Sequence, residues 1–433
     1  MAVMTSVAAA EDWARGLDEL AERIAPRFCR IEARQRARSY LGGLLAPLER
    51  KNGWRLAEAA GDASPDSVQD FLSRMRWDAD AVRDDLRAYV VEHLGDADAV
   101  MALDETGFIK KGEHSVGVQR QYSGTAGRIE NCQVGVFLGY ASRHGHALLD
   151  RALYLPKTWA GDEERRRIAW VPEDVSFATK PKLGIKMLER ALDAGVPCAW
   201  VTGDCVYGGD SALRRFLEHR RVGYVLAVTS AQHLGLVPVL DWVEDVPADG
   251  WHRLSAGAGS KGPRLYDWAF LPFRGAVPAD WGKGLLIRRS LGETQELAFY
   301  LTSAPPGTRL ADLVRVAGTR WTIEECFEAA KGEVGLDQYE VRSWTGWHRH
   351  ITLAMLALAY LTVLRKAAIG GRGPDQSGRR PAALDRARDP PPAVPPGHPK
   401  PRRSQRRYRL VALAKAPPAT GTAQPLETTY SNQ

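Results

Sequence analysis

Apolar residues recur at helical spacing through residues 12–95, for example at Leu17, Leu20 and Ile24. Gly and Pro residues divide this region into separate helices. The stretch Trp54–Leu72 has the outline of a helix-turn-helix, in which Ser64 would cap the second helix and Pro65 would be its first residue. Any antiparallel helix pair gives the same outline, so both a DNA-binding unit and a structural hairpin remain open.

The pattern changes at residue 100, where a continuous apolar run ends in Asp104 and Gly107. Such a run predicts a buried central strand that delivers a carboxylate at its end. A second run of this kind, Cys198–Asp204, follows an amphipathic helix. The other elements expected in this region are strands at Ser115–Tyr122, Asn131–Tyr140, Ala147–Leu155 and Gly223–Val228 and helices at Leu183–Ala194 and Asp210–His219.

Short aromatic-rich segments separated by Gly, Pro and Ser turns occupy residues 229–311 and predict a β-rich insertion. A helix over Arg320–Lys331 then resumes the α/β pattern, and Trp344–Lys366 adds a core helix. We therefore expect an α/β core made of residues 96–228 and 312–368, preceded by a helical domain at 12–95. The longest apolar run, Ile351–Leu364, is shorter than the roughly 20 residues that a membrane-spanning helix needs, so we expect it to be buried.

Charge is distributed unevenly along the 433 residues, whose formal net charge is +7. Residues 370–433 hold twelve Lys or Arg and four Asp or Glu, which leaves 47 basic and 48 acidic residues in the rest of the chain. This Pro- and Arg-rich tail has the composition of a disordered segment. Its abrupt start favours a frameshifted replacement, and the alternative is a basic arm that adds affinity for phosphates.

The five cysteines form no C-x-x-C pair, which argues against a disulfide framework or a zinc site. The N-terminal residues have no basic-then-apolar signal pattern. We therefore expect a cytoplasmic protein, associated with the nucleoid if it binds DNA.

Four arginines of the helical region follow one another at intervals of three or four residues. Arg27, Arg30, Arg34 and Arg38 would form a basic stripe along one helix face, which could follow the phosphates of double-stranded DNA. The alternative is an ordinary solvated helix face.

A second constellation combines three carboxylates from distant parts of the chain. Arg320, Glu324 and Lys331 stand at i, i+4 and i+11, which places them on one face of a helix. An Arg and a Glu four residues apart are also common on solvated helices. Together with Asp104 and Asp204, however, Glu324 would supply the oxygen ligands that hard divalent cations prefer. Two such ions can stabilise the attacking and leaving oxygens of phosphodiester transfer. Glu325 and Glu328 are nearby alternatives to Glu324.

These residues give the chain a resemblance to the DDE transposases of bacterial insertion sequences, most similar to insertion-sequence family 701, over about residues 15–366. The segments that carry it are Leu103–Phe108 with Lys110 and Lys111, Val201–Asp204, and the helix of Arg320, Glu324 and Lys331. Related transposases have a Tyr three residues before this Arg, where the present chain has Ala317.

The resemblance implies an RNase H-like mixed sheet with flanking helices. It also implies cleavage at transposon ends and strand transfer into target DNA, with Mg²⁺ as cofactor and Mn²⁺ able to replace it. Asp104, Asp204 and Glu324 would be the catalytic and metal-binding residues. Arg320, Lys331, Lys110 and Lys111 would contact DNA. The implied partners are double-stranded DNA, including terminal inverted repeats, and a second copy of the chain. The alternatives are a non-transposing RNase H-like nuclease and a catalytically inactive transposase that only binds DNA.

Overall fold

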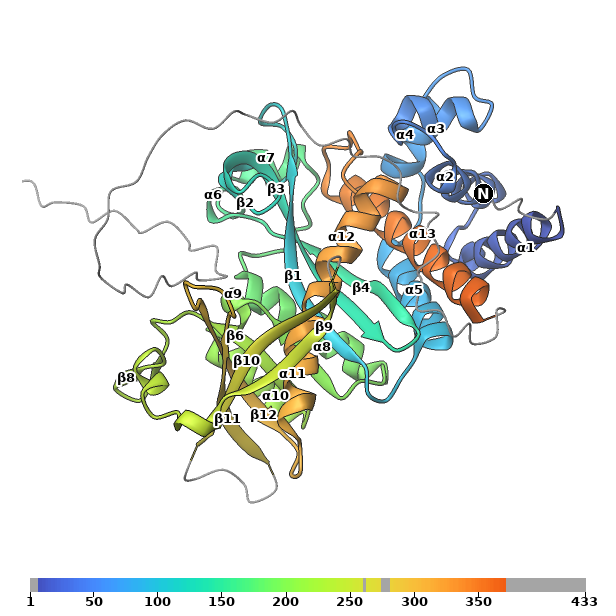
Figure 1. The fold of residues 1–433 in the computed structure, drawn as a ribbon. Helices are drawn as coiled ribbons and strands as arrows, with labels where there is room; N and C mark the ends of the chain where they lie inside the picture. Colours follow the sequence, from blue (N-terminus) through green and yellow to red (C-terminus); the bar gives the residue numbers. More distant parts are fainter. Residues whose placement is uncertain (1–6, 260–261, 274–280, 371–433) are drawn as a thin grey trace, which may run out of the picture.

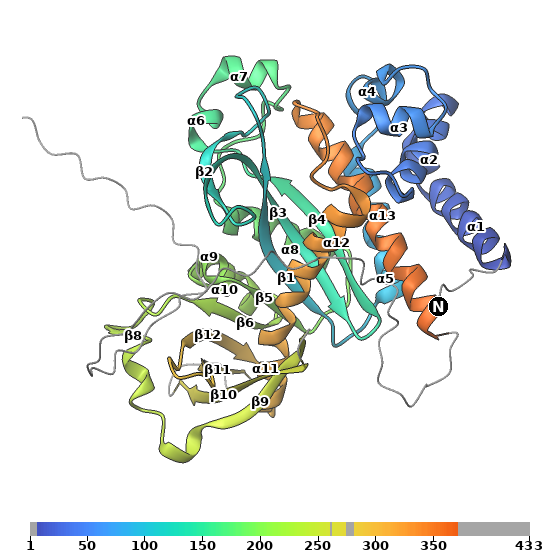
Figure 2. The same cartoon turned by 45° about the horizontal axis from the view of Figure 1, so that its top comes forward.

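The computed structural model describes residues 7–259, 262–273 and 281–370. Except for Gly370, the tail that we expected to be disordered lies outside these residues. Helices α1 to α5 and α13 gather at one side of the molecule, and strands β9 to β12 lie at the opposite side (Figures 1 and 2). A single long sheet connects the two sides.

The sheet has ten strands, in the order β2-β3-β1-β5-β6-β12-β11-β10-β9, with β4 paired to β3. Pairs β1–β5 and β5–β6 are parallel, and the other pairs are antiparallel. A mixed sheet of this kind with flanking helices confirms the expected RNase H-like α/β fold. The core strands are β1 (Val100–Ile109), β2 (Gln119–Ser123), β3 (Arg128–Ser142), β4 (Gly145–Leu153), β5 (Trp200–Gly203) and β6 (Gly223–Val228).

Strand β1 is longer than the apolar pattern predicted. We expected it to end at Asp104 and turn at Gly107, but its antiparallel pairing with β3 continues to Ile109 opposite Cys132. Gly107 is not a turn residue: it pairs with Val134 of β3, and a Cβ atom there would lie 2.4 Å from Oγ of Ser123 in β2. Asp104 therefore lies in the middle of a strand.

Helices cover both faces of the central strands. Side chains alternate between the faces of a strand, and on β1 the side chain of Leu103 lies against the helix α8 (Lys180–Asp193). The side chain of Asp104 points to the other face, where α12 (Trp321–Val334) crosses β1 (Figure 1). The remaining helices of the core are α6 (Lys157–Ala160), α7 (Glu163–Ile168), α9 (Cys205–Gly208), α10 (Ser211–His219) and α11 (Leu310–Thr319).

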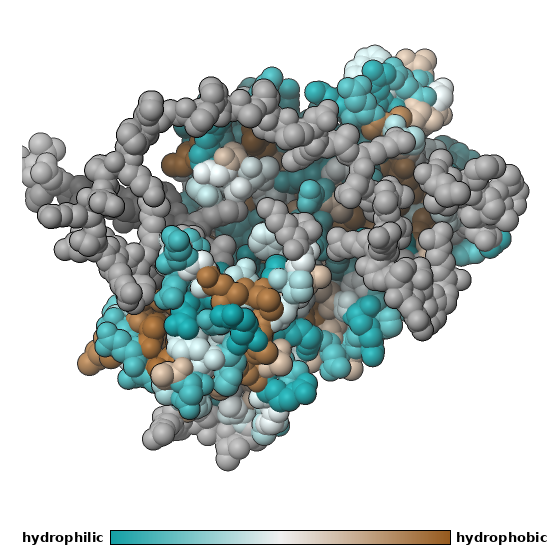
Figure 3. Space-filling model, viewed as in Figure 1, coloured by the Kyte–Doolittle hydropathy of each residue, from teal (hydrophilic) through white to brown (hydrophobic). Residues whose placement is uncertain are grey.

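The expected β-rich insertion continues the central sheet. Its strands are β9 (His252–Gly259), β10 (Gly262–Pro272), β11 (Gly282–Arg289) and β12 (Leu297–Ala304), with a small hairpin of β7 (His233–Leu234) and β8 (Val237–Pro238) before them. Strand β12 pairs with β6 of the core. Trp268 of β10 is buried in one apolar cluster with Val100 of β1 and Leu313 of α11. Apolar surface is visible over the insertion at the lower left of Figure 3.

The N-terminal helices pack around the last helix, α13 (Trp344–Gly370). The hydroxyl of Tyr40 lies 2.7 Å from Nδ1 of His350, and Arg349 donates a hydrogen bond of 2.8 Å to the carbonyl of Trp77. By length and composition α13 could cross a membrane, although residues 351–360 are buried inside the protein. The N-terminal helices are α1 (Val7–Ile24), α2 (Ile31–Leu45), α3 (Gly53–Ala59), α4 (Asp66–Ser73) and α5 (Ala79–Leu94).

The start of α4 differs from the expected capping pattern. Pro65 is the residue before the helix, and Asp66 is its first residue. The hydroxyl of Ser64 donates a hydrogen bond of 2.9 Å to the Asp66 carboxylate and accepts a long one of 3.4 Å from the Asp66 amide. Ser64 therefore contacts the first helical residue, but from one position further away than expected.

Candidate active site

The strand register brings Asp104 and Asp204 together. The parallel pairing of β1 with β5 ends at Leu103 opposite Gly203. Asp104 directly follows Leu103, and Asp204 directly follows Gly203. Neighbouring strands lie about 4.8 Å apart. Asp204 then caps α9 by accepting a hydrogen bond of 2.9 Å from the amide of Val206. Both carboxylates are thus fixed at the edge of the parallel part of the sheet.

Both aspartates are poorly solvated: Asp104 is 8% exposed and Asp204 is 7% exposed. Burial, together with the charge of Asp204, raises the pKa of Asp104 to about 7. Burial and the nearby Glu105 raise the pKa of Asp204 to about 6. Perturbed carboxyls of this kind are concentrated in functional sites, because their charged form is held in an environment that disfavours it.

Arg320 connects the aspartates to Glu324. It stands at the junction of α11 and α12, and its guanidinium lies 3.4 Å from Oδ2 of Asp104 and 2.9 Å from Oε1 of Glu324. Arg320 therefore partly neutralises both carboxylates and lies between them. Glu325 and Glu328 are exposed and line an acidic cavity of about 850 Å³, which Lys331 also lines. Of these three glutamates, Glu324 is the one that faces the aspartates.

Lys331 lies on the same side of α12 as Glu324, and it contacts β1 two residues beyond Asp104. Its ammonium donates hydrogen bonds of 2.8 Å to the hydroxyl of Thr106 and 2.9 Å to that of Thr125. Arg320 and Lys331 thus both extend over β1, at residues 104 and 106.

The lysines after β1 have different environments. Lys110 donates a hydrogen bond of 3.0 Å to the carbonyl of Tyr339, and its ammonium lies 3.5 Å from the centre of that ring. Burial lowers the pKa of Lys110 to about 8. Lys111 is exposed. Lys110 is therefore engaged within the protein, whereas Lys111 faces solvent.

Sequence reasoning missed Glu105, on the opposite face of β1 from Asp104. Its carboxylate receives hydrogen bonds of 2.8 Å from the Lys180 ammonium and 2.9 Å from the Tyr207 hydroxyl. Tyr207 lies three residues after Asp204, on α9, so Glu105 connects the two strands that carry the aspartates. The acidic pair Asp104–Glu105 was the available signal, but only the contacts show that the two side chains have separate partners.

The chemistry of these side chains suits a hard divalent cation, because carboxylate oxygens are its preferred ligands. Among the described residues, however, no group of three or more His, Cys, Asp or Glu side chains is close enough to hold a metal ion. Asp104 and Asp204 are adjacent, whereas the guanidinium of Arg320 separates them from Glu324. The aspartate pair fits such an ion, and Glu324 would have to leave Arg320 to join it.

The arginine stripe on the N-terminal helices is largely paired within the protein. Arg27 makes two hydrogen bonds to Asp85, at 2.8 and 2.7 Å, and Arg38 lies 2.7 Å from Asp18. Arg34 donates a hydrogen bond of 3.0 Å to the carbonyl of Phe28, and Arg30 is exposed. The structure thus does not present the four arginines as one free basic face.

Helix α4, the second helix of the predicted helix-turn-helix, buries Val68, Phe71 and Leu72. Its more exposed positions include Asp66 and Asp70. Two acidic side chains on that face would repel DNA phosphates, so the structure offers no support for α4 as a groove-reading helix.

The fold and the paired aspartates together are those of the RNase H-like nucleases. Residues 23–238 match the family model described as DDE superfamily endonuclease, and the chain belongs to this family. The match includes Asp104 and Asp204 and ends before Glu324.

A curated relative supports the same assignment. The chain is 26% identical over 204 residues to a protein of Microchaete diplosiphon named "Probable transposase for insertion sequence element IS701". That similarity covers 45% of this chain and 49% of the relative, so the chain matches about half of the relative's length.

Proposed function

We propose that this protein is a DNA transposase that cuts phosphodiester bonds at the ends of an insertion sequence and joins those ends to target DNA. The observation that carries the proposal is the register that sets Asp104 beside Asp204, with Arg320 and Glu324 facing them from α12. Membership of the DDE superfamily endonucleases and the similarity to a protein named as a transposase support it.

In this proposal Asp104 and Asp204 hold Mg²⁺, which Mn²⁺ can replace, and Glu324 completes the ligand set. The bound metal would stabilise the negative charge that develops on the reacting phosphate oxygens. Arg320 neutralises Asp104 and Glu324 in the free protein. A DNA phosphate can accept the same paired hydrogen bonds from its planar guanidinium, so DNA binding could draw Arg320 away from the two carboxylates. Lys331, on the same side of α12, would contact the next phosphate, and Lys111 would add an exposed positive charge.

The bond changes balance without an external energy source. In cleavage, a water oxygen attacks phosphorus, the bond from phosphorus to the 3′ oxygen breaks, and that oxygen takes up a proton. In joining, the new 3′ hydroxyl attacks a phosphodiester of the target, forms one P–O bond and releases another 3′ hydroxyl. One phosphodiester thus replaces another. The two ends of an element would each need an active site, so we propose that two copies of the chain act together on the DNA in the cytoplasm.

The test is a cleavage and joining assay on a plasmid that carries the DNA flanking this gene, with Mg²⁺, with Mn²⁺ and with EDTA. We expect metal-dependent 3′ ends and joined products from the unaltered protein. Asp104→Asn, Asp204→Asn and Glu324→Gln should each reduce cleavage by about 10⁴-fold or more, roughly 5 kcal/mol of barrier.

Glu328→Gln is the matched control, since this exposed glutamate lies one turn from Glu324 and makes no contact with Arg320 or the aspartates among the described residues. It should cleave like the unaltered protein. Cleavage without joining would replace the proposal by a non-transposing nuclease. DNA binding without cleavage would replace it by a catalytically inactive transposase.

A further inference from the structure

A cavity of about 860 Å³ lies among the N-terminal helices, at the beginning of α2. It is formed by the segment before α2, the first turn of that helix, and the segment that follows α4. Its lining residues are Cys29, Arg30, Glu32, Ala33, Arg74, Met75 and Arg76. Three arginines from two separate segments thus surround one space.

The three arginines of the cavity have fewer acidic partners than Arg27 and Arg38 of the arginine stripe. Arg30 and Arg76 form no ion pair with another described residue. Arg74 lies 3.2 Å from Asp70 on the helix surface, and 78% of its side chain is exposed. Glu32 contributes an opposing charge. The cavity therefore keeps a surplus of positive charge. The charges of Arg27 and Arg38, by contrast, are neutralised by acidic partners.

The backbone adds to this positive character. Helix α2 has 15 residues, and Arg30, the residue before it, makes no side-chain hydrogen bond to its first turn. The first amide groups of a helix point outward and carry a partial positive charge. Guanidinium groups bind phosphate oxygens with paired hydrogen bonds. Both features of the cavity thus favour an anion with several oxygens.

The size of the cavity indicates which anion. Pockets of roughly 300–1,000 Å³ hold drug-sized ligands. A single phosphate ion would fill only a small part of such a volume. We propose that this cavity, defined by Arg30, Arg74 and Arg76, binds the sugar-phosphate backbone of DNA and that it replaces the paired stripe as the phosphate-contacting surface of the N-terminal helices. The choice of DNA over another polyanion rests on the proposed function.

Cys29 provides a direct reporter, because it lines the cavity and is the exposed one of the five free cysteines; the other four are buried or half-buried. The experiment follows the rate at which a maleimide dye modifies the full-length protein, without DNA and with a duplex of arbitrary sequence about four helical turns long. Arbitrary sequence suffices because backbone contacts do not depend on the bases. Cys29→Ser identifies the fast-reacting thiol.

We expect the duplex to slow modification of Cys29 about tenfold at low salt, and added salt to restore the rate. The double variant Arg30→Ala/Arg76→Ala should lose this protection, and the slope of log affinity against log salt should fall by about two. Replacing both residues by Lys should keep most of the slope, because the charges remain. The matched control is Arg27→Ala/Arg38→Ala, which removes two neutralised arginines and should change the slope little.

The outcomes separate this inference from the proposed transposase activity. Protection of Cys29 in a protein that cuts no element ends would keep the cavity as a DNA site and overturn only the transposase. Cleavage with no protection, or an unchanged slope in the Arg30/Arg76 variant, would overturn the cavity. Equal protection by millimolar inorganic phosphate would also overturn it, since the site would then bind a free anion rather than the DNA backbone.

Discussion

Two clusters of charged side chains in this protein have different compositions. One is the candidate active site, where Asp104, Asp204, Glu105 and Glu324 face the two cations Arg320 and Lys180. The other, here called the β4 network, lies where β4 meets α5, α8 and α13. It consists of Asp80, Arg83, Asp84, Asp150, Arg151 and Arg190. Carboxylates outnumber cations in the first cluster, whereas the second has three carboxylates and three arginines.

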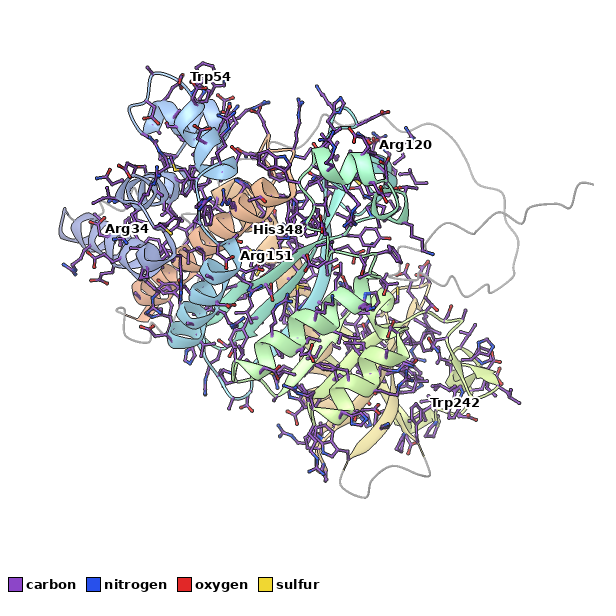
Figure 4. The ribbon with its side chains drawn as sticks, turned by 180° about the vertical axis from the view of Figure 1, so that it is seen from behind. Arg34, Trp54, Arg120, Arg151, Trp242 and His348 are labelled. Atoms are coloured by element: carbon purple, nitrogen blue, oxygen red, sulfur yellow. The ribbon has the colours of Figure 1, made fainter. Side chains whose placement is uncertain are left out.

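The charged groups of the β4 network contact one another, although Nη2 of Arg151 is buried with no hydrogen-bond partner among the described residues. Arg151 lies 2.8 Å from Asp80 and donates a hydrogen bond of 2.8 Å to Thr352, and Arg190 lies 2.9 Å from Asp150. Burial alone would raise the pKa of Asp80, but Arg151 and Arg83 outweigh it and lower that pKa to about 2. Arg151 and His348 lie close together in the middle of the molecule (Figure 4). Burial and the charge of Arg151 lower the pKa of His348 to about 3, so this imidazole is neutral.

The difference between the clusters is informative about function. The β4 network satisfies its charges with residues of the chain itself, which is what a structural ion network requires. The candidate active site leaves two aspartates with raised pKa values, a condition that a bound cation would relieve. The same chain thus contains one charge cluster with equal numbers of carboxylates and arginines and one with an excess of carboxylates.

The largest effect should follow from removing the central cation of the β4 network. Arg151→Ala leaves Asp80 and Asp150 without that partner, and we expect the free energy of unfolding to fall by about 3–5 kcal/mol. The measurement is a urea titration at pH 7. Arg167→Ala is the control, because its exposed pair with Glu164 should contribute less than about 1 kcal/mol. Equal effects of the two variants would mean that the network is not structural.

A smaller effect is expected from Glu105, which we propose positions the aspartates from the opposite face of β1. Glu105→Gln keeps the shape but removes the charge that binds Lys180 and Tyr207. Positioning residues of metal sites typically contribute 10- to 100-fold, so Mg²⁺ affinity should fall by roughly that factor. Titration of Mg²⁺ by calorimetry measures it. The Mg²⁺ dependence of cleavage should shift in parallel, while the rate at saturating Mg²⁺ changes less. An unchanged affinity would assign Glu105 to the fold alone.

The smallest effect has the opposite sign. The folded-state pKa of Asp104, about 7, is above the ordinary value of 3.8, so the stability linked to its protonation is present below pH 4 and is lost as the pH rises through 7. Asn cannot ionise. Without metal, Asp104→Asn should therefore be more stable than the unaltered protein at pH 8, by about 1–2 kcal/mol, and nearly equal to it at pH 4.

Thermal unfolding at the two pH values tests this difference. Mg²⁺ at pH 8 should raise the melting temperature of the unaltered protein more than that of Asp104→Asn, since only the former keeps the carboxylate ligand. A variant that is less stable at pH 8 would show that attraction to Arg320 outweighs the burial of the charge.

Local sequence patterns predicted the helices and strands of this fold better than they predicted the contacts between distant segments. The apolar runs before Asp104 and Asp204 identified β1 and β5, and the helical spacing of Arg320, Glu324 and Lys331 identified the face of α12. The predicted end of β1 was wrong because the strand ends where its pairing with β3, a separate segment, ends. The sequence did not show that Arg27 and Arg38 pair with carboxylates, because their partners Asp85 and Asp18 lie on other helices. Glu105 was missed for the same reason.

The pairing of β12 with β6 also determines which parts of the molecule can be separated. Strand β6, with the sequence Gly-Tyr-Val-Leu-Ala-Val, has β5 on one side and β12 on the other. Deleting residues 229–311 would leave its backbone amides and carbonyls unpaired along one side, on a segment of high β propensity. An unpaired apolar strand of this kind invites other chains to add to it and form aggregates. We therefore expect that the α/β core of this protein cannot be shortened by excising these strands and stay soluble, because they protect the side of the sheet from which they emerge.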